Sequence, residues 1–106
     1  MIQIQYKIEK SFYSYLKVEG HAPATFGKSG ENILCSAVSV LAQTLFLLLD
    51  ESGKVSAKKI EKGKMEMTIS LPNETTNTQF EFFLRGILNL QKQYKDILNI
   101  QKIGGK

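Results

Sequence analysis

Apolar and polar residues alternate along the start of the chain. Residues 2–9, IQIQYKIE, place an apolar side chain at every second position, and residues 12–20, FYSYLKVEG, repeat the alternation. A period of two is typical of a strand with one buried face. Lys10 and Ser11 favour a turn between the runs, so we expect a β-hairpin. In the second run, Phe12, Ser14, Leu16 and Val18 fall on one face, and Tyr13, Tyr15, Lys17 and Glu19 on the other.

The period changes after Asn32 to that of a helix. Apolar residues then recur at helical spacing as far as Leu49, with further apolar residues on the other faces. Such a helix is either central to the core or covered by a partner subunit. Asn32 is its expected N-cap, and residues 50–53 its expected end. Polar interruptions and a length short of a typical membrane span favour a buried helix.

The second half of the chain repeats this order of elements. Residues 54–72 read as two strands with a turn at 61–64, residues 76–94 as a second helix, and residues 96–103 as a last strand. The order β-β-α-β-β-α-β predicts an α+β fold. We expect a small single domain spanning residues 1–106, with a mostly antiparallel sheet of about five strands and two helices on one face.

Composition and charge indicate where this protein is located in the cell and what it could bind. The single cysteine excludes an intramolecular disulfide, and the N-terminus lacks the features of a signal peptide, so we expect a cytoplasmic protein without a membrane partner. The net charge is +4, with lysines scattered rather than clustered. This charge favours proximity to something acidic such as ribosomal RNA, but defines no nucleic-acid site.

The only histidine, His21, and the only cysteine, Cys35, stand on either side of a glycine-bearing loop. With Asn32 as N-cap, Cys35 falls in the first helical turn, where free N–H groups and the helix dipole favour a thiolate nucleophile. An imidazole supplies the matching base and acid. In the plainer interpretation, Cys35 is a small buried hydrophobe and His21 a turn residue. One histidine and one cysteine are too few for a zinc site, and we expect no metal and no cofactor.

The string Gly20-His21-Ala22, a glycine loop and NILCSAVSVL resembles the signature of the ribosomal-processing cysteine protease family (Prp), roughly G-H-A, a glycine loop and D-I-V-C-A-A-V-S. The string covers about a fifth of the chain, and the length and element order match over nearly all of it. The resemblance implies a homodimeric bacterial endopeptidase that removes an N-terminal extension from ribosomal protein 27 of the large subunit. It makes Cys35 the nucleophile and His21 the general base and acid.

The sequence departs from this family pattern in two places, and the first is beside the expected nucleophile. The family aspartate is replaced by Asn32, preceded by Glu31. Asparagine can cap a helix and orient an imidazole, but it carries no charge. Either Glu31 supplies the carboxylate, or the carboxylate is dispensable, or activity is low. Ser39 matches the family serine one turn after Cys35, where its hydroxyl either assists the site or bonds to the Cys35 carbonyl.

The second departure is a slightly longer loop, APATFGKSGE. Small residues and glycines favour a segment that orders when substrate binds, although an ordinary surface loop has the same composition. Its expected substrate-facing residues are Ala22, Pro23, Phe26, Gly27 and Gly30.

A different class of protein fits the same sequence. A non-catalytic dimeric module associated with the ribosome or its RNA needs only the basic surface, and a purely structural dimer needs neither the surface nor the thiol. Reactivity of Cys35 distinguishes these alternatives from a peptidase, because a buried packing cysteine is inert to alkylation.

Overall fold

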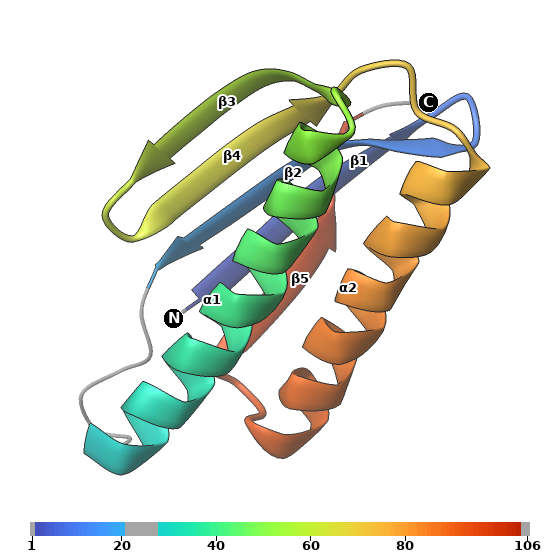
Figure 1. Cartoon of the computed structure of the whole chain (residues 1–106). Helices are drawn as coiled ribbons and strands as arrows, with labels where there is room; N and C mark the ends of the chain where they lie inside the picture. The colour runs from blue at the N-terminus through green and yellow to red at the C-terminus, as the bar shows by residue number, and fades with distance from the viewer. Residues whose placement is uncertain (1, 21–27, 105–106) are drawn as a thin grey trace.

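The computed structural model forms one five-stranded sheet with both helices on the same face (Figure 1). It describes residues 2–20 and 28–104, without the side chains of 28–32. This confirms the predicted α+β class and the predicted order of elements. The elements are β1 (Ile2–Glu9), β2 (Phe12–Gly20), α1 (Lys28–Glu51), β3 (Val55–Glu61), β4 (Lys64–Ile69), α2 (Glu74–Gln93) and β5 (Leu98–Lys102).

The sheet is mixed, with the strand order β3-β4-β2-β1-β5. The pairs β1–β2, β2–β4 and β3–β4 are antiparallel, and β5 runs parallel to β1. The predominance of antiparallel pairs agrees with the sequence-based expectation. The two edges of the sheet are β3 and β5, and β3 is the edge strand beside α1 (Figure 1).

A β-bulge in the first hairpin changes which residues of β2 face the helices. Lys7 pairs with Tyr15 and Ile8 with Tyr13, so Ser14 is the extra residue between two ladder positions. The bulge turns Tyr13 toward the helices, where its ring stacks on Phe80 with centroids 4.3 Å apart. Simple alternation placed Tyr13 on the opposite face from Leu16, whereas both are buried in the core. That prediction is wrong because alternation does not detect an inserted residue.

The core lies between the sheet and the two helices. Asn73 caps α2 in a capping box: its side chain accepts a hydrogen bond from the Thr76 backbone N–H, and the Thr76 hydroxyl accepts one from the Asn73 N–H. Gly86 lets the helices approach closely, because a β-carbon there would lie 2.9 Å from a Leu41 methyl. The largest fully buried side chains are Phe80, Phe83, Ile4, Leu16, Leu34, Leu49, Met67 and Ile87.

Helix α1 begins at Lys28 and not after Asn32, so the N-cap predicted at Asn32 is wrong. The first five residues, KSGEN, contain no apolar side chain. An apolar pattern detects only the part of a helix that packs on the core, and this helix starts before that part. Its end at Glu51, followed by Gly53 at φ 71°, agrees with the predicted stop.

The expectation that the apolar stretch of α1 falls short of a membrane span is wrong. Within the described residues, Ile33–Glu51 is long and apolar enough to cross a membrane, by length and composition alone, and 33% of it is buried in the protein. A core helix of a soluble protein passes the same test. One face of α1 packs on the sheet, while Val40, on the opposite face, is 63% exposed.

Candidate active site

Cys35 lies in the second turn of α1, half-buried at the edge of a groove. Because the helix starts seven residues earlier, the free N–H groups of its first turn belong to residues before Cys35. The argument that the helix start itself activates this thiol is therefore wrong. What the structure gives Cys35 instead is a free sulfur at the wall of a cavity open to solvent.

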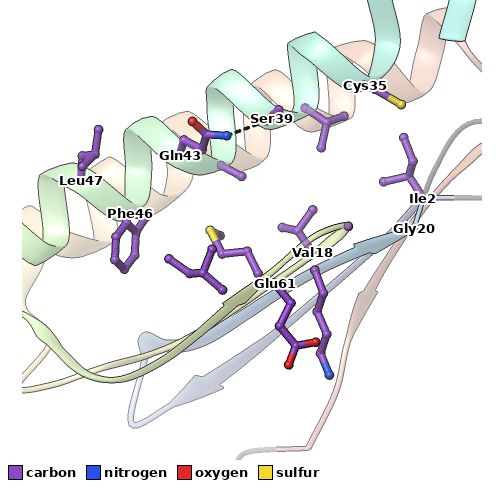
Figure 2. Close-up of a pocket in the computed structure, with 15 residues that line it drawn as sticks. Ile2, Val18, Gly20, Cys35, Ser39, Gln43, Phe46, Leu47 and Glu61 are labelled. Carbon is purple, nitrogen blue, oxygen red and sulfur yellow. Dashed lines mark hydrogen bonds between the residues drawn. The ribbon is translucent and has the colours of Figure 1, made fainter. Parts of the chain in front are cut away.

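The groove runs between α1 and the sheet and has a volume of about 500 Å³. Figure 2 shows Cys35 and Ser39 in successive turns of α1, across from Ile2 and Gly20 at the ends of their strands. On the side opposite α1, the groove is also lined by residues at the tip of the β3–β4 hairpin: Ile60, Glu61, Gly63, Lys64 and Met65. The lining is largely apolar, so the groove suits an extended segment with large apolar side chains.

The end of the groove far from Cys35 is closed by an aromatic ring. Phe46 of α1 lines the groove, and the Lys58 ammonium of β3 lies 5.4 Å from the centre of its ring. The same ammonium is 3.8 Å from the Asp50 carboxylate of α1. These contacts join α1 to the edge strand β3.

Polar groups occur at a few points along the groove. The Gln43 amide donates a hydrogen bond of 2.8 Å to the Ser39 hydroxyl, one turn closer to Cys35 (Figure 2). At the hairpin tip, Glu61 pairs with Lys59 at 3.4 Å, and Lys64 with Glu66 at 3.8 Å. Ser39 thus has a hydrogen-bond partner within α1. The hairpin tip, on the opposite side of the groove, carries both carboxylates and ammonium groups.

The other predicted site residues belong to the segment before the groove. His21, Ala22, Pro23, Phe26 and Gly27 lie outside the described residues. Gly30, Glu31 and Asn32 fall in the first turns of α1, on the Cys35 end of the helix, and their side chains are outside the description as well. Gly20, the residue bonded to His21, lines the groove together with Cys35.

Sequence reasoning missed most of the groove. Gln43, Phe46 and Ile60 line it, but none of them belongs to the motif around Cys35. Gln43 carried a signal, since it stands eight residues after Cys35 as a polar residue within an apolar run. Ile60 carried none, because its place at the groove depends on how the β3–β4 hairpin lies against α1.

Two tyrosines whose hydroxyl pKa values are raised lie away from the groove. Burial, followed by the hydrogen bond from its hydroxyl to the Glu66 carboxylate, raises the pKa of Tyr15 to about 12. Burial and the hydrogen bond to Glu81 raise the pKa of Tyr13 above its ordinary value. The bond from Tyr15 also holds the pKa of Glu66 below its usual range. These pairs join elements of the fold and are not part of the site.

The part of the chain that the structure describes contains no cluster of side chains that could bind a metal ion. Within residues 2–20 and 28–104, no three histidine, cysteine, aspartate or glutamate side chains come together as a metal site would require. The described groove therefore offers a thiol, hydroxyl and amide groups, and apolar walls. A free thiol at the edge of a peptide-sized groove is one part of a cysteine-protease site, which also needs a base beside the thiol.

Comparison with known families identifies the class of this chain. The model of the cysteine protease Prp family matches residues 1–99, so the chain belongs to the Prp family of cysteine proteases. The resemblance noted from the motif around His21 and Cys35 is thereby confirmed. Comparison with curated protein sequences finds no match.

Solved structures share the whole fold. The protein SMU.848 from Streptococcus mutans is 25% identical, with a TM-score of 0.81, over 100% of this chain and 96% of that one. The essential ribosomal processing protease Prp from Staphylococcus aureus, in complex with a substrate peptide, is 12% identical, with a TM-score of 0.80, over 97% of this chain and 100% of that one. The same S. aureus protease with a covalently linked product peptide gives a TM-score of 0.79 at 11% identity.

Proposed function

We propose that this chain is a bacterial cytoplasmic endopeptidase that removes the N-terminal extension of large-subunit ribosomal protein 27. The observation that carries the proposal is the groove, which is lined both by Cys35 of α1 and, across from it, by Gly20, the residue before His21. The match to the Prp family and the peptide complexes of the S. aureus protease support a peptide as substrate. The net charge of +4 favours work near ribosomal RNA.

The proposed reaction is acyl transfer to Cys35. His21 takes the thiol proton, and the sulfur attacks the carbonyl carbon of the scissile peptide bond. The C–N bond breaks as the imidazolium returns the proton to the departing amine. Water, deprotonated by His21, then attacks the thioester, which releases the carboxylic acid and restores the thiol. No cofactor enters this cycle.

The remaining predicted residues have supporting roles. Asn32 or Glu31 orients the imidazole, and Ser39, whose hydroxyl already accepts a hydrogen bond from Gln43, helps to place the substrate at the groove. Ala22, Pro23, Phe26 and Gly27 form the substrate loop. Gly30, which the sequence also assigned to that loop, belongs to the first turn of α1 instead. The peptide lies between α1 and the hairpin tip, beside the edge strand β3, with apolar side chains toward Phe46 and Ile60.

A cleavage assay with a matched variant tests the proposal. The substrate is a synthetic peptide with the extended N-terminus of ribosomal protein 27 from the same genome, and the products are read by mass. We expect Cys35→Ala to lose about 10³-fold or more of the wild-type rate. Ser36→Ala, in the same turn but exposed, should retain it. Equal cleavage by wild type and Cys35→Ala would refute the proposal.

The same preparation separates the alternative of a non-catalytic module. Salt-sensitive RNA binding that survives Cys35→Ala, together with no cleavage by the wild type, would favour a ribosome- or RNA-associated binding protein. We also propose that the chain acts as a homodimer, as the family resemblance implies.

A further inference from the structure

Cys35, Ser39 and Gln43 form a row along the side of α1 that lines the groove. Successive members are four residues apart, so they lie on one face of the helix with a rise of about 6 Å between them. All three line the groove. Cys35 and Ser39 have roles in the proposed peptidase, whereas Gln43 has been given none. We call these three residues the α1 row.

The hydrogen bond between Gln43 and Ser39 has a defined direction. The Gln43 amide N–H donates to the Ser39 oxygen, with 2.8 Å between nitrogen and oxygen (Figure 2). Within residues 2–20 and 28–104, this is the one side-chain hydrogen bond of Ser39, so its O–H has no acceptor there. Helical serines often donate to the carbonyl four residues earlier, here that of Cys35, and Ser39 does not. Its O–H is left to donate to a group in the groove.

The spacing of the α1 row matches the repeat of an extended peptide. Two residues of a strand span about 6.6 Å, and carbonyl groups two residues apart point to the same side. When the carbonyl of the cleaved bond is at the Cys35 sulfur, the next carbonyl on that side lies beside Ser39.

The closed end of the groove indicates which part of the peptide passes Ser39. Phe46 closes the groove beyond Gln43, so the short N-terminal extension fits there, and the folded ribosomal protein stays outside. The residue that supplies the cleaved carbonyl is counted as the first before the cleaved bond. The carbonyl beside Ser39 then belongs to the third residue before that bond.

We propose that Gln43 is a positioning residue that fixes Ser39 as a hydrogen-bond donor to this backbone carbonyl. By donating to the Ser39 oxygen, the Gln43 amide directs the O–H away from itself and toward the bound peptide. The bond anchors an extended main chain beside Cys35, and the apolar walls of the groove then select side chains. The inference rests on the proposed function and adds to it one residue and one substrate atom.

Gln43→Glu tests the direction of the bond, because it reverses the bond without changing the length of the side chain. A carboxylate only accepts, so the Ser39 hydroxyl must donate to it and has no hydrogen left for the peptide. In the cleavage assay, this variant should raise KM about tenfold at unchanged kcat, since the bond contributes equally in bound substrate and transition state. A pair that only supports the helix would leave KM unchanged. Glutamate and glutamine have similar helix propensities, so the melting curve should stay that of the wild type.

A double-mutant cycle separates this role from an effect of the new charge. Ser39→Ala should also raise KM about tenfold, and Gln43→Glu in that background should add nothing, because it acts through Ser39. A direct effect of charge on the peptide would persist in the double variant. Two controls in α2, outside the groove, should keep the wild-type KM: Gln93→Glu, and Thr78→Ala, which removes an exposed hydroxyl bond to the Glu74 carbonyl.

A substituted peptide identifies the substrate atom. The carbonyl oxygen of the third residue before the cleaved bond is replaced by sulfur, which is a weaker acceptor. This replacement should raise the KM of the wild type several-fold and leave the KM of Gln43→Glu unchanged. The same replacement at the second residue should have little effect, because its carbonyl points to the other side of an extended chain.

Three results would overturn the inference while the proposed peptidase stands: an unchanged KM in Gln43→Glu, additive effects in the double variant, or equal effects of sulfur at the two peptide positions. A wild type that cleaves no peptide would refute the proposed function, and this inference with it. The two failures are therefore distinguishable in the same assay.

Discussion

The two helices lie side by side on the same face of the sheet but differ in almost every other respect (Figure 1). Helix α2 starts with a capping box, buries Phe80 and Phe83, and carries charged residues such as Glu81 and Arg85 on its outer face. Helix α1 has no charged residue over its central turns and exposes apolar side chains. The comparison indicates that α2 mainly holds the fold together, while α1 carries the thiol and one wall of the groove.

The largest expected effect on stability comes from the core face of α2. Phe80 is fully buried and stacks on Tyr13, so Phe80→Ala should lower the free energy of unfolding by about 3–5 kcal/mol. Phe82, two residues away and 75% exposed, is the control, and Phe82→Ala should cost little. Urea unfolding measures both changes, and equal losses would contradict the burial that distinguishes these residues.

Substitutions at the groove should affect peptide binding rather than stability. Ile60 of β3 lines the groove and is 59% exposed, so Ile60→Glu should raise the KM for the peptide about tenfold, through loss of an apolar contact of roughly 1.4 kcal/mol. Lys59, the preceding residue, faces the other side of the sheet with Glu66. Lys59→Glu should leave KM nearly unchanged. A larger effect of Lys59→Glu than of Ile60→Glu would move the peptide to the other face.

The capping box of α2 gives a smaller, purely structural effect. Thr76 is 3% exposed and exchanges hydrogen bonds with Asn73, so Thr76→Ala should cost about 1 kcal/mol of unfolding free energy. The kcat for peptide cleavage should stay at the wild-type value, because the cap lies outside the groove. Loss of cleavage at unchanged stability would show that α2 has a functional role that the comparison denies.

The smallest effect is the alkaline titration of Tyr15. Its pKa is raised from 10.0 to about 12, so the protonated phenol is favoured in the folded state. Its contribution to stability is therefore complete below pH 10 and is lost as the pH rises through 12. Tyr15→Phe should make unfolding less dependent on pH in this window. An unchanged pH dependence in that variant would contradict the hydrogen bond to Glu66.

The sequence predicted the elements well because each one has a strong local signal. Alternation identified β1 and β2, and helical spacing identified both helices. Errors arose where the outcome depends on contacts between distant segments or on residues with no apolar signal. The bulge at Ser14, which turns Tyr13 to the core, and the polar first turn of α1, which moves the helix start to Lys28, are the two clear cases.

The candidate site was predictable only in part. Cys35 and His21 stand out as the only thiol and the only imidazole, and the family motif joins them. The groove is invisible to such a motif, because Phe46 and Ile60 come together through packing of α1 against the edge strand. The sequence showed that α1 has apolar residues on more than one face, but the structure was needed to show which of them remain exposed.

The rate at which iodoacetamide alkylates the thiol tests the central claim most directly. Cys35 is the only cysteine, so labelling reports on one sulfur atom. An activated thiol paired with His21 should label quickly at neutral pH, and His21→Ala should slow the labelling about tenfold or more, while Ser36→Ala should not. Equally slow labelling of the wild type and His21→Ala would contradict the account and leave Cys35 as a packing residue.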